Sequence, residues 1–166
     1  QELRDAFVKE MSGAPPLSKD QKDLVARCLE LGNVDDGNFR EIKSTEYKVK
    51  YSIKHNRSDP YEHDVGIGLA ITEIDASPAE VLAWRVAWCS NEKMQIHRED
   101  TKSDSRYIVA LVSANEAILE TTKRFPLFFK SRQFMIRAVW GIIDDGSYVF
   151  CWENFEEGSI PGLDIS

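Results

Sequence analysis

Histidine and cysteine, the side chains on which metal sites and many catalytic sites depend, are scarce in this chain of 166 residues. There are three of each, and no two of them have the spacing of zinc ligands. The sequence also contains no G-x-S-x-G motif and no phosphate-binding P-loop. We therefore predict no catalytic residues, no metal site and no cofactor. The odd number of widely spaced cysteines predicts reduced thiols and a cytoplasmic protein.

Long apolar runs and an excess of positive charge are also absent. No run approaches the roughly 18–20 apolar residues that a membrane-spanning helix needs. The N-terminal residues 1–11 are charged throughout and lack the apolar core of a signal peptide. The net charge of −7 argues against a nucleic-acid partner, whose phosphates basic residues would have to neutralise. With 42% hydrophobic and 30% charged residues, the composition predicts one globular domain with a sizeable core.

Two capping boxes predict where helices begin. In the first, the Ser18 hydroxyl can cap a helix while Gln21 reaches back to it. In the second, Ser77 is the N-cap and Glu80 completes the box. Residues 81–88, which follow the second box, are apolar except for one arginine. We therefore expect this helix to be mostly buried, with its two tryptophans on one face.

Alternation of apolar and polar residues predicts strands over much of the remaining chain. The Asp144-Asp145-Gly146 segment lies between two runs rich in aromatic and β-branched residues, which is a strong signal for a β-hairpin. The predicted strands are residues 46–54, 65–74, 94–96, 107–113, 117–122, 133–143 and 147–155. Strands arranged in hairpins around one buried helix predict the α+β class with an antiparallel sheet.

Two segments resemble the START lipid-transfer domain of the START-like (helix-grip) superfamily. The first is FPLFFKSRQFMIRAVW, residues 125–140, followed by DDGSYVF, residues 144–150, although Gln133 stands where the family usually has Asp. The second is DASPAEVLAWRVAW, residues 75–88, which is similar to the family's step from a strand into a helix. The resemblance covers roughly residues 39–162.

The resemblance implies a helix-grip fold, in which a curved antiparallel sheet is closed by a long C-terminal gripping helix. We place this domain in residues 18–166, after an N-terminal helix and linker in residues 1–17. Because the sequence ends before such a gripping helix, we expect the domain to be incomplete at its C-terminal end. Some family members have a buried arginine in the cavity, but the corresponding position here is Ala138, so sterol specificity is not implied.

The function that the resemblance implies is non-enzymatic binding of a lipid or sterol-like hydrophobic molecule, as a lipid-sensing or transfer module. A curved sheet that faces a helix can enclose such a ligand without any catalytic group. The candidate ligand-binding residues are Leu69, Ile71, Trp84, Trp88, Val109, Leu111, Phe134, Ile136, Ala138 and Trp140. Two alternatives remain open: an interaction module of the same fold in which these residues fill a core, and a cyclase-type enzyme of the START-like superfamily.

A membrane contact is predicted from five consecutive apolar residues at 125–129, which basic residues bracket in an otherwise acidic chain. The candidate membrane-contact residues are Lys123, Arg124, Phe128, Phe129 and Lys130. Such contact would be peripheral and transient, because the net charge of the chain opposes it. In the alternative, which the resemblance favours, the apolar residues pack under the sheet.

Overall fold

The computed structural model describes residues 5–6, 9–10, 13–32, 39–43, 48–55, 66–101, 106–123 and 130–155. The chain divides into two compact units, one formed by Gln1–Leu24 with Ser77–Ser166 and the other by Val25–Ala76. Helix α2 (Lys19–Leu31) begins in the first unit and continues into the second. Two further helices, α3 and α4, and seven antiparallel strands complete the element order of the described residues.

The second unit contains a three-stranded antiparallel sheet. Its strands are β1 (Arg40–Ile42), β2 (Val49–His55) and β3 (Gly66–Thr72), with β2 in the centre. The strands predicted at residues 46–54 and 65–74 are confirmed as β2 and β3, while parts of both predictions fall outside the described residues. β1 has no counterpart among the predicted strands, because its three residues are too few to show alternation.

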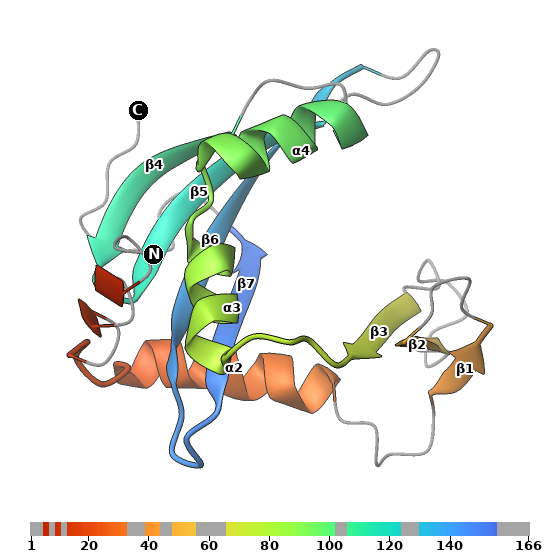
Figure 1. Cartoon of the computed structure of the whole chain (residues 1–166), viewed down its shortest axis with the longest axis horizontal. Coiled ribbons are helices and arrows are strands. Elements are labelled where there is room, and N and C mark those ends of the chain that lie inside the picture. The colour runs from red at the N-terminus through yellow and green to blue at the C-terminus, as the bar shows by residue number, and fades with distance from the viewer. Residues whose placement is uncertain are drawn as a thin grey trace. The chain divides into compact units, whose positions relative to one another are not determined.

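The first unit contains a four-stranded antiparallel sheet in the order β4-β5-β6-β7 (Figure 1). Its strands are β4 (Arg106–Ser113), β5 (Glu116–Lys123), β6 (Arg132–Ile142) and β7 (Tyr148–Asn154). The four strands predicted in this part of the chain are confirmed, each within one residue at either end. The strands expected in one curved sheet therefore form two sheets, of three and four strands, in the described part of the chain.

The turn between β6 and β7 has the geometry that its Asp-Gly sequence predicts. Gly146 has a φ of 82°, a left-handed conformation that glycine adopts without a steric penalty. The Ile143 N–H donates to the Ser147 carbonyl at 2.9 Å, and the Asp145 carboxylate accepts from the Ser147 N–H at 2.8 Å. The hairpin prediction is confirmed, and this turn fixes the register of β6 against β7.

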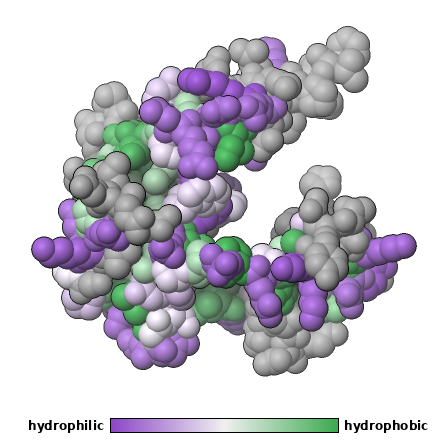
Figure 2. Space-filling model, viewed as in Figure 1, coloured by the Kyte–Doolittle hydropathy of each residue, from purple (hydrophilic) through white to green (hydrophobic). Residues whose placement is uncertain are grey.

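Helices α3 (Pro78–Val86) and α4 (Asn91–Thr101) lie against one face of the four-stranded sheet (Figure 1). The predicted capping box of α3 is confirmed: the Ser77 hydroxyl accepts from the Glu80 N–H at 3.3 Å, and the Glu80 carboxylate accepts from the Ser77 N–H at 2.8 Å. The strand predicted at residues 94–96 is wrong, because the buried side chains of α4 recur at the four-residue spacing of a helix. In Figure 2, hydrophilic residues dominate the upper surface of α4 and a hydrophobic patch lies along its lower edge.

The face of the four-stranded sheet that carries α3 and α4, here called the inner face, forms a hydrophobic core. The core residues are Leu82, Ala117, Leu119, Ile136, Ala138 and Trp140, with Val86, Trp88, Tyr148 and Phe150 packed at their margin. The rings of Trp140 and Phe150 lie nearly parallel, with centroids 6.5 Å apart. The core thus joins one helix to three adjacent strands.

The helix predicted over residues 81–88 is less buried than its apolar sequence indicates. It ends at Val86, so Trp88 lies beyond it in a turn. Leu82 is 3% exposed, whereas Trp84, two residues later and hence on the opposite side, is 46% exposed. The reason is geometric: a nine-residue helix lying on one sheet turns only one side toward the core, whatever the composition of its other side.

We predict that Leu82→Ala lowers the free energy of unfolding by about 3 kcal/mol, the usual cost of removing a buried leucine side chain. Trp84→Ala removes a larger but half-exposed side chain from the same helix and should cost about 1 kcal/mol or less. Urea denaturation of the two variants and the wild type would measure both losses. Equal losses would show that Trp84 is as deeply buried as Leu82, contrary to its position here.

The opposite face of the sheet, here called the outer face, contains a buried arginine with three acidic partners. The guanidinium of Arg137 in β6 donates to Glu116 of β5 at 2.7 Å and to Glu153 of β7 at 3.2 Å, and it also pairs with Asp20 of α2. Burial alone would lower the pKa of Arg137, but hydrogen bonds and charges from Glu116 and Asp20 raise it above its ordinary value. The arginine is therefore a permanently charged centre that joins three strands to a helix.

Two further contacts hold the start of α2 on the outer face. The predicted Ser18–Gln21 capping box is confirmed, and the Gln21 side chain also donates to Glu116 at 2.8 Å. Leu17 packs over Gly141, where an added Cβ would lie 2.9 Å from Leu17 Cδ2. Glycine at this position of β6 therefore permits the close approach of the segment that leads into α2.

We predict that Arg137→Met lowers the free energy of unfolding by about 3–5 kcal/mol, because it leaves the buried Glu116 carboxylate without its ionic partner. Asp20→Asn is the matched control: the Asp20 side chain is 73% exposed, so loss of its charge should cost about 1 kcal/mol or less. The double variant Arg137→Met/Glu116→Met should lose less stability than the sum of its single variants. Additive losses in chemical denaturation would contradict the direct coupling of these two side chains.

Candidate functional site

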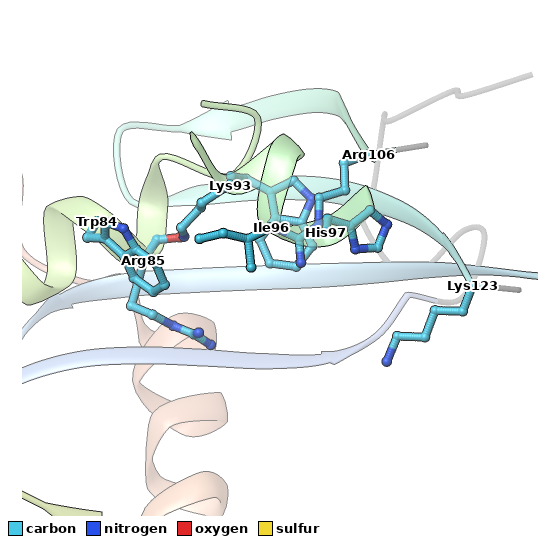
Figure 3. Close-up of a pocket in the computed structure, with 8 residues that line it drawn as sticks. Trp84, Arg85, Lys93, Ile96, His97, Arg106 and Lys123 are labelled. Atoms are coloured by element: carbon cyan, nitrogen blue, oxygen red, sulfur yellow. The ribbon is translucent and has the colours of Figure 1, made fainter. Parts of the chain in front are cut away.

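A pocket of about 200 Å³ lies between α3, α4 and the inner face of the four-stranded sheet. Its lining residues are Trp84, Arg85, Trp88, Lys93, Ile96, His97, Arg106 and Lys123. Figure 3 shows the pocket running from Trp84 and Arg85 at one end to Arg106 and Lys123 at the other, with the α4 residues between them. None of these eight residues is acidic, in a chain whose net charge is −7. The pocket therefore concentrates positive charge within an acidic protein.

The turn between α3 and α4 brings the lining residues together. Arg85 lies in the last turn of α3, and the Ser90 hydroxyl accepts from the Lys93 N–H at 3.4 Å at the start of α4. Lys93 and His97 are both buried and lie four residues apart, so they project from the same side of α4 toward the sheet. His97 Nε2 lies 3.5 Å from the Thr121 hydroxyl of β5.

Two tryptophan rings form apolar walls against which cations lie. Lys93 Nζ is 4.2 Å from the centroid of the Trp84 ring and donates to the Arg85 carbonyl at 2.9 Å. Arg106 Cζ is 4.2 Å from the centroid of the Trp88 ring. Contacts between a cation and an aromatic face stabilise the cation without neutralising its charge. The positive charge of the pocket therefore remains available to a further group.

Burial and the repulsion between positive charges lower the pKa values of two basic residues of the pocket, Lys93 and Arg106. Burial, followed by the charges of Arg85 and Arg106, lowers the pKa of Lys93 to about 8. Burial also lowers the pKa of Arg106, which Cys89 raises and Arg85 lowers further. The Nε atom of Arg106 is buried and has no hydrogen-bond partner among the described residues. A buried donor without a partner costs free energy, so an acceptor at this position would stabilise the pocket.

We predict that the Lys93 amine titrates with a pKa of about 8 in the folded chain. NMR titration of the lysine ε-carbons would measure it, with Lys93→Met identifying the signal. Because the unfolded chain retains this proton up to about pH 10.5, the contribution of Lys93 makes folding stability rise with pH between about 8 and 10.5.

The control for this titration is Arg85→Gln, which keeps the backbone carbonyl that accepts from Lys93. This variant should raise the pKa of Lys93, because it removes one of the two neighbouring charges that oppose protonation. A Lys93 pKa that Arg85→Gln leaves unchanged would show that the two side chains do not share the pocket.

The structure distributes the ten predicted ligand-binding residues among several places. Those buried in the core are Ile136, Ala138 and Trp140. Phe134 lies half-buried on the same inner face. Those that line the pocket are Trp84 and Trp88, and those exposed on β4 are Val109 and Leu111. Leu69 and Ile71 lie on β3, in the other unit. Their role in binding a ligand stays a prediction.

The remaining six lining residues were not predicted from the sequence as part of a binding site. They are Arg85, Lys93, Ile96, His97, Arg106 and Lys123, of which Lys123 was predicted only as a membrane contact. Lys93 and His97 were not recognised because a strand was predicted at residues 94–96, so their helical spacing was not considered. Trp152 was also missed, although its two-residue spacing from Phe150 places both side chains on one face of β7.

The inner face changes from basic to apolar along its strands. Facing residues form three successive rows across the sheet, which are Arg106–Thr121–Phe134, then Ile108–Leu119–Ile136–Asn154, then Leu111–Ala117–Ala138–Trp152. A register shift in β4 between Ile108 and Ala110 keeps Ile108 and Leu111 on the same face although they are three residues apart. Leu111 is 72% exposed and Trp152 is 53% exposed, so the last row ends in exposed apolar side chains on both edges.

The predicted membrane-contact segment lies mostly outside the described residues, which include neither Arg124, Phe128 nor Phe129. Lys123 and Lys130 are exposed, and Lys123 Nζ lies 5.9 Å from the centroid of the Phe134 ring. In the part of the chain that the structure describes, no helix has both the length and the apolar character to cross a membrane. That same part contains no group of three His, Cys, Asp or Glu side chains placed to hold a metal ion.

Comparison with known proteins supports the fold. No protein-family model matches the chain, and no curated protein sequence matches it. Among solved structures, the crystal structure of human STARD10 is similar, with a TM-score of 0.58 and 15% sequence identity. The similar region covers 90% of this chain and 56% of the STARD10 chain. The antiparallel sheets and helices of this chain therefore have a START-like α+β fold, as the sequence motifs predict.

Proposed function

We propose that the chain binds a lipid or sterol-like hydrophobic molecule on the inner face of the four-stranded sheet, without catalysing a reaction. The observation that carries this proposal is the row of the inner face that ends in Leu111 and Trp152, two large apolar side chains that are mostly exposed. Exposed apolar surface of this kind marks binding sites for ligands, membranes or proteins. A START-like fold, shown by the similarity to human STARD10, favours a small hydrophobic ligand among these.

The apolar rows offer enough surface to make such binding favourable. Ile108 of β4 is also exposed, and it lies on the inner face one row closer to the pocket than Leu111. The central residues of the rows, Leu119, Ile136, Ala117 and Ala138, are buried, so an alkyl chain would lie along the exposed side chains at the ends of the rows. Burial of one methylene group contributes about 0.8 kcal/mol, so contact along about six methylene groups contributes up to about 5 kcal/mol before ordering costs.

One observation favours a different function. Ile136, Ala138 and Trp140, three of the predicted ligand-binding residues, are buried together with Leu82 of α3 in the hydrophobic core. In a second candidate function, the exposed apolar side chains of the inner face contact a protein partner. The two functions differ in what should accompany the purified chain: a small hydrophobic molecule supports the first, and a protein complex supports the second.

The proposed localisation is the cytoplasm, and transient contact with a membrane surface is part of the proposal. Cys28, Cys89 and Cys151 form no disulfide bond with one another in the described part of the chain, which favours a reducing compartment. Lys123 and Lys130 are exposed at the ends of the segment predicted to touch membrane, and basic residues favour an anionic lipid surface. A ligand taken up on the inner face would come from such a surface.

We predict that Leu111→Asp and Trp152→Asp each weaken binding of a fluorescent long-chain alcohol by about tenfold or more, because a charge in the apolar rows opposes an alkyl chain. The matched control is Tyr107→Asp, which adds the same charge at an exposed position of β4 that faces Glu120 on the outer face. Fluorescence titration would measure binding, and circular dichroism would verify the fold of each variant. Equal weakening in all three variants would place the ligand elsewhere, and absence of binding by the wild type would remove the proposal.

A further inference from the structure

We infer that the basic pocket between α3 and α4 holds the anionic group of the ligand, a phosphate or a carboxylate, while its apolar part lies along the inner face. This inference rests on the proposed function and names the chemical class of the ligand: an anionic amphipathic molecule, in preference to a neutral sterol or a zwitterionic lipid. The supporting observations are the charge of the pocket, its hydrogen-bond donors, its volume and its position beside Ile108 and Leu111.

Charge provides the first argument. Arg85, Lys93, Arg106 and Lys123 line the pocket, and their partners among the described residues are aromatic rings and a backbone carbonyl. The Arg137 network on the other face of the same sheet shows the contrast, since that guanidinium has three carboxylate partners. Cations that have no acidic partner among the described residues repel one another in a partly buried site, and an anion placed between them would remove this repulsion.

Hydrogen bonding provides the second argument. The buried Nε–H of Arg106 has no acceptor in the described part of the chain, and the Lys93 amine donates one hydrogen bond, to the Arg85 carbonyl. An arginine and a lysine can together offer several donors to the oxygens of one phosphate or carboxylate. Hydrogen bonds between such charged groups are roughly twice as strong as those between neutral groups.

Volume and position provide the third argument. At about 200 Å³ the pocket is smaller than the roughly 300–1,000 Å³ of sites that enclose a whole drug-sized ligand. It therefore fits a head group, and the remainder of the ligand must leave it. Arg106 lines the pocket, and Ile108 and then Leu111 come next on the same face of β4, at increasing distance from Arg106. An alkyl chain attached to an anion in the pocket would meet the exposed side chains of Ile108 and then Leu111 along β4.

The test compares three probes on the full chain by isothermal titration calorimetry: dodecyl phosphate below its micelle concentration, dodecanol below its solubility limit, and inorganic phosphate. Dodecyl phosphate should bind about tenfold or more tightly than dodecanol, since it alone adds charge-assisted hydrogen bonds to the same tail. Lys93→Met and Arg106→Gln should remove this preference by lowering the affinity for dodecyl phosphate to about that for dodecanol measured on the same variant. Lys22→Met, which removes one positive charge from an exposed position on α2, is the control and should leave the preference intact.

The probes separate the failure of this inference from the failure of the proposed function. Equal affinity for dodecyl phosphate and dodecanol would overturn the anionic ligand and retain hydrophobic binding. Binding of inorganic phosphate as tightly as dodecyl phosphate, with no binding of dodecanol, would show a site for a free anion and overturn the lipid function. If no probe binds a chain that circular dichroism shows to be folded, both are wrong. Loss of the preference in Lys22→Met would assign it to net charge instead of to the pocket.

Discussion

The buried guanidinium of Arg137 is the constraint on which the arrangement of the first unit depends. It lies in the central part of the four-stranded sheet and contacts a carboxylate on each neighbouring strand, Glu116 and Glu153, and one on α2. A charge at this depth is tolerated only when hydrogen bonds surround it, so the positions of its partners are tightly specified. This network fixes which face of the sheet the start of α2 covers.

Because α2 contacts the outer face, the inner face is left to α3 and α4. These two helices are short, and they leave exposed the two ends of one row, Leu111 and Trp152. The cations on the two faces of this sheet therefore have different partners. The outer face pairs its buried arginine with acids, whereas the cations beside the inner face contact tryptophan and phenylalanine rings. Both faces thus hold the fold together, the outer one through ion pairs and the inner one through its hydrophobic core.

Local signals in the sequence predicted most of the fold, and the site was harder to foresee. Capping at Ser18 and Ser77 and the turn at Gly146 involve residues a few positions apart, so the sequence alone contains the whole interaction. The exposure of Trp84 depends on what covers the far side of α3, which no local pattern records. Burial of Lys93 and His97 was not predicted for a different reason. The charged segment that contains them was predicted to form a strand and a turn, whereas it forms helix α4.

Arg137 illustrates the limit of arguments from sequence position. Comparison with the START family directs attention to position 138 as the place of a cavity arginine, and Ala138 lies there in the inner core. The neighbouring residue is an arginine whose side chain points to the opposite face, because successive residues of a strand alternate between faces. Its partners come from α2, β5 and β7, and no spacing rule connects segments so far apart in the chain.

The same network has a consequence for the order in which the chain folds. Strands β4 to β7 pair with their neighbours along the sequence, so each pairing closes only a short loop. The contacts of α2 with this sheet span 95 residues from Gln21 to Glu116 and 117 residues from Asp20 to Arg137. During synthesis from the N-terminus, α2 emerges long before the strands that it will contact, and the intervening unit is completed first. We therefore expect α2 to be among the last elements to dock, so that its contact with Arg137 completes the first unit.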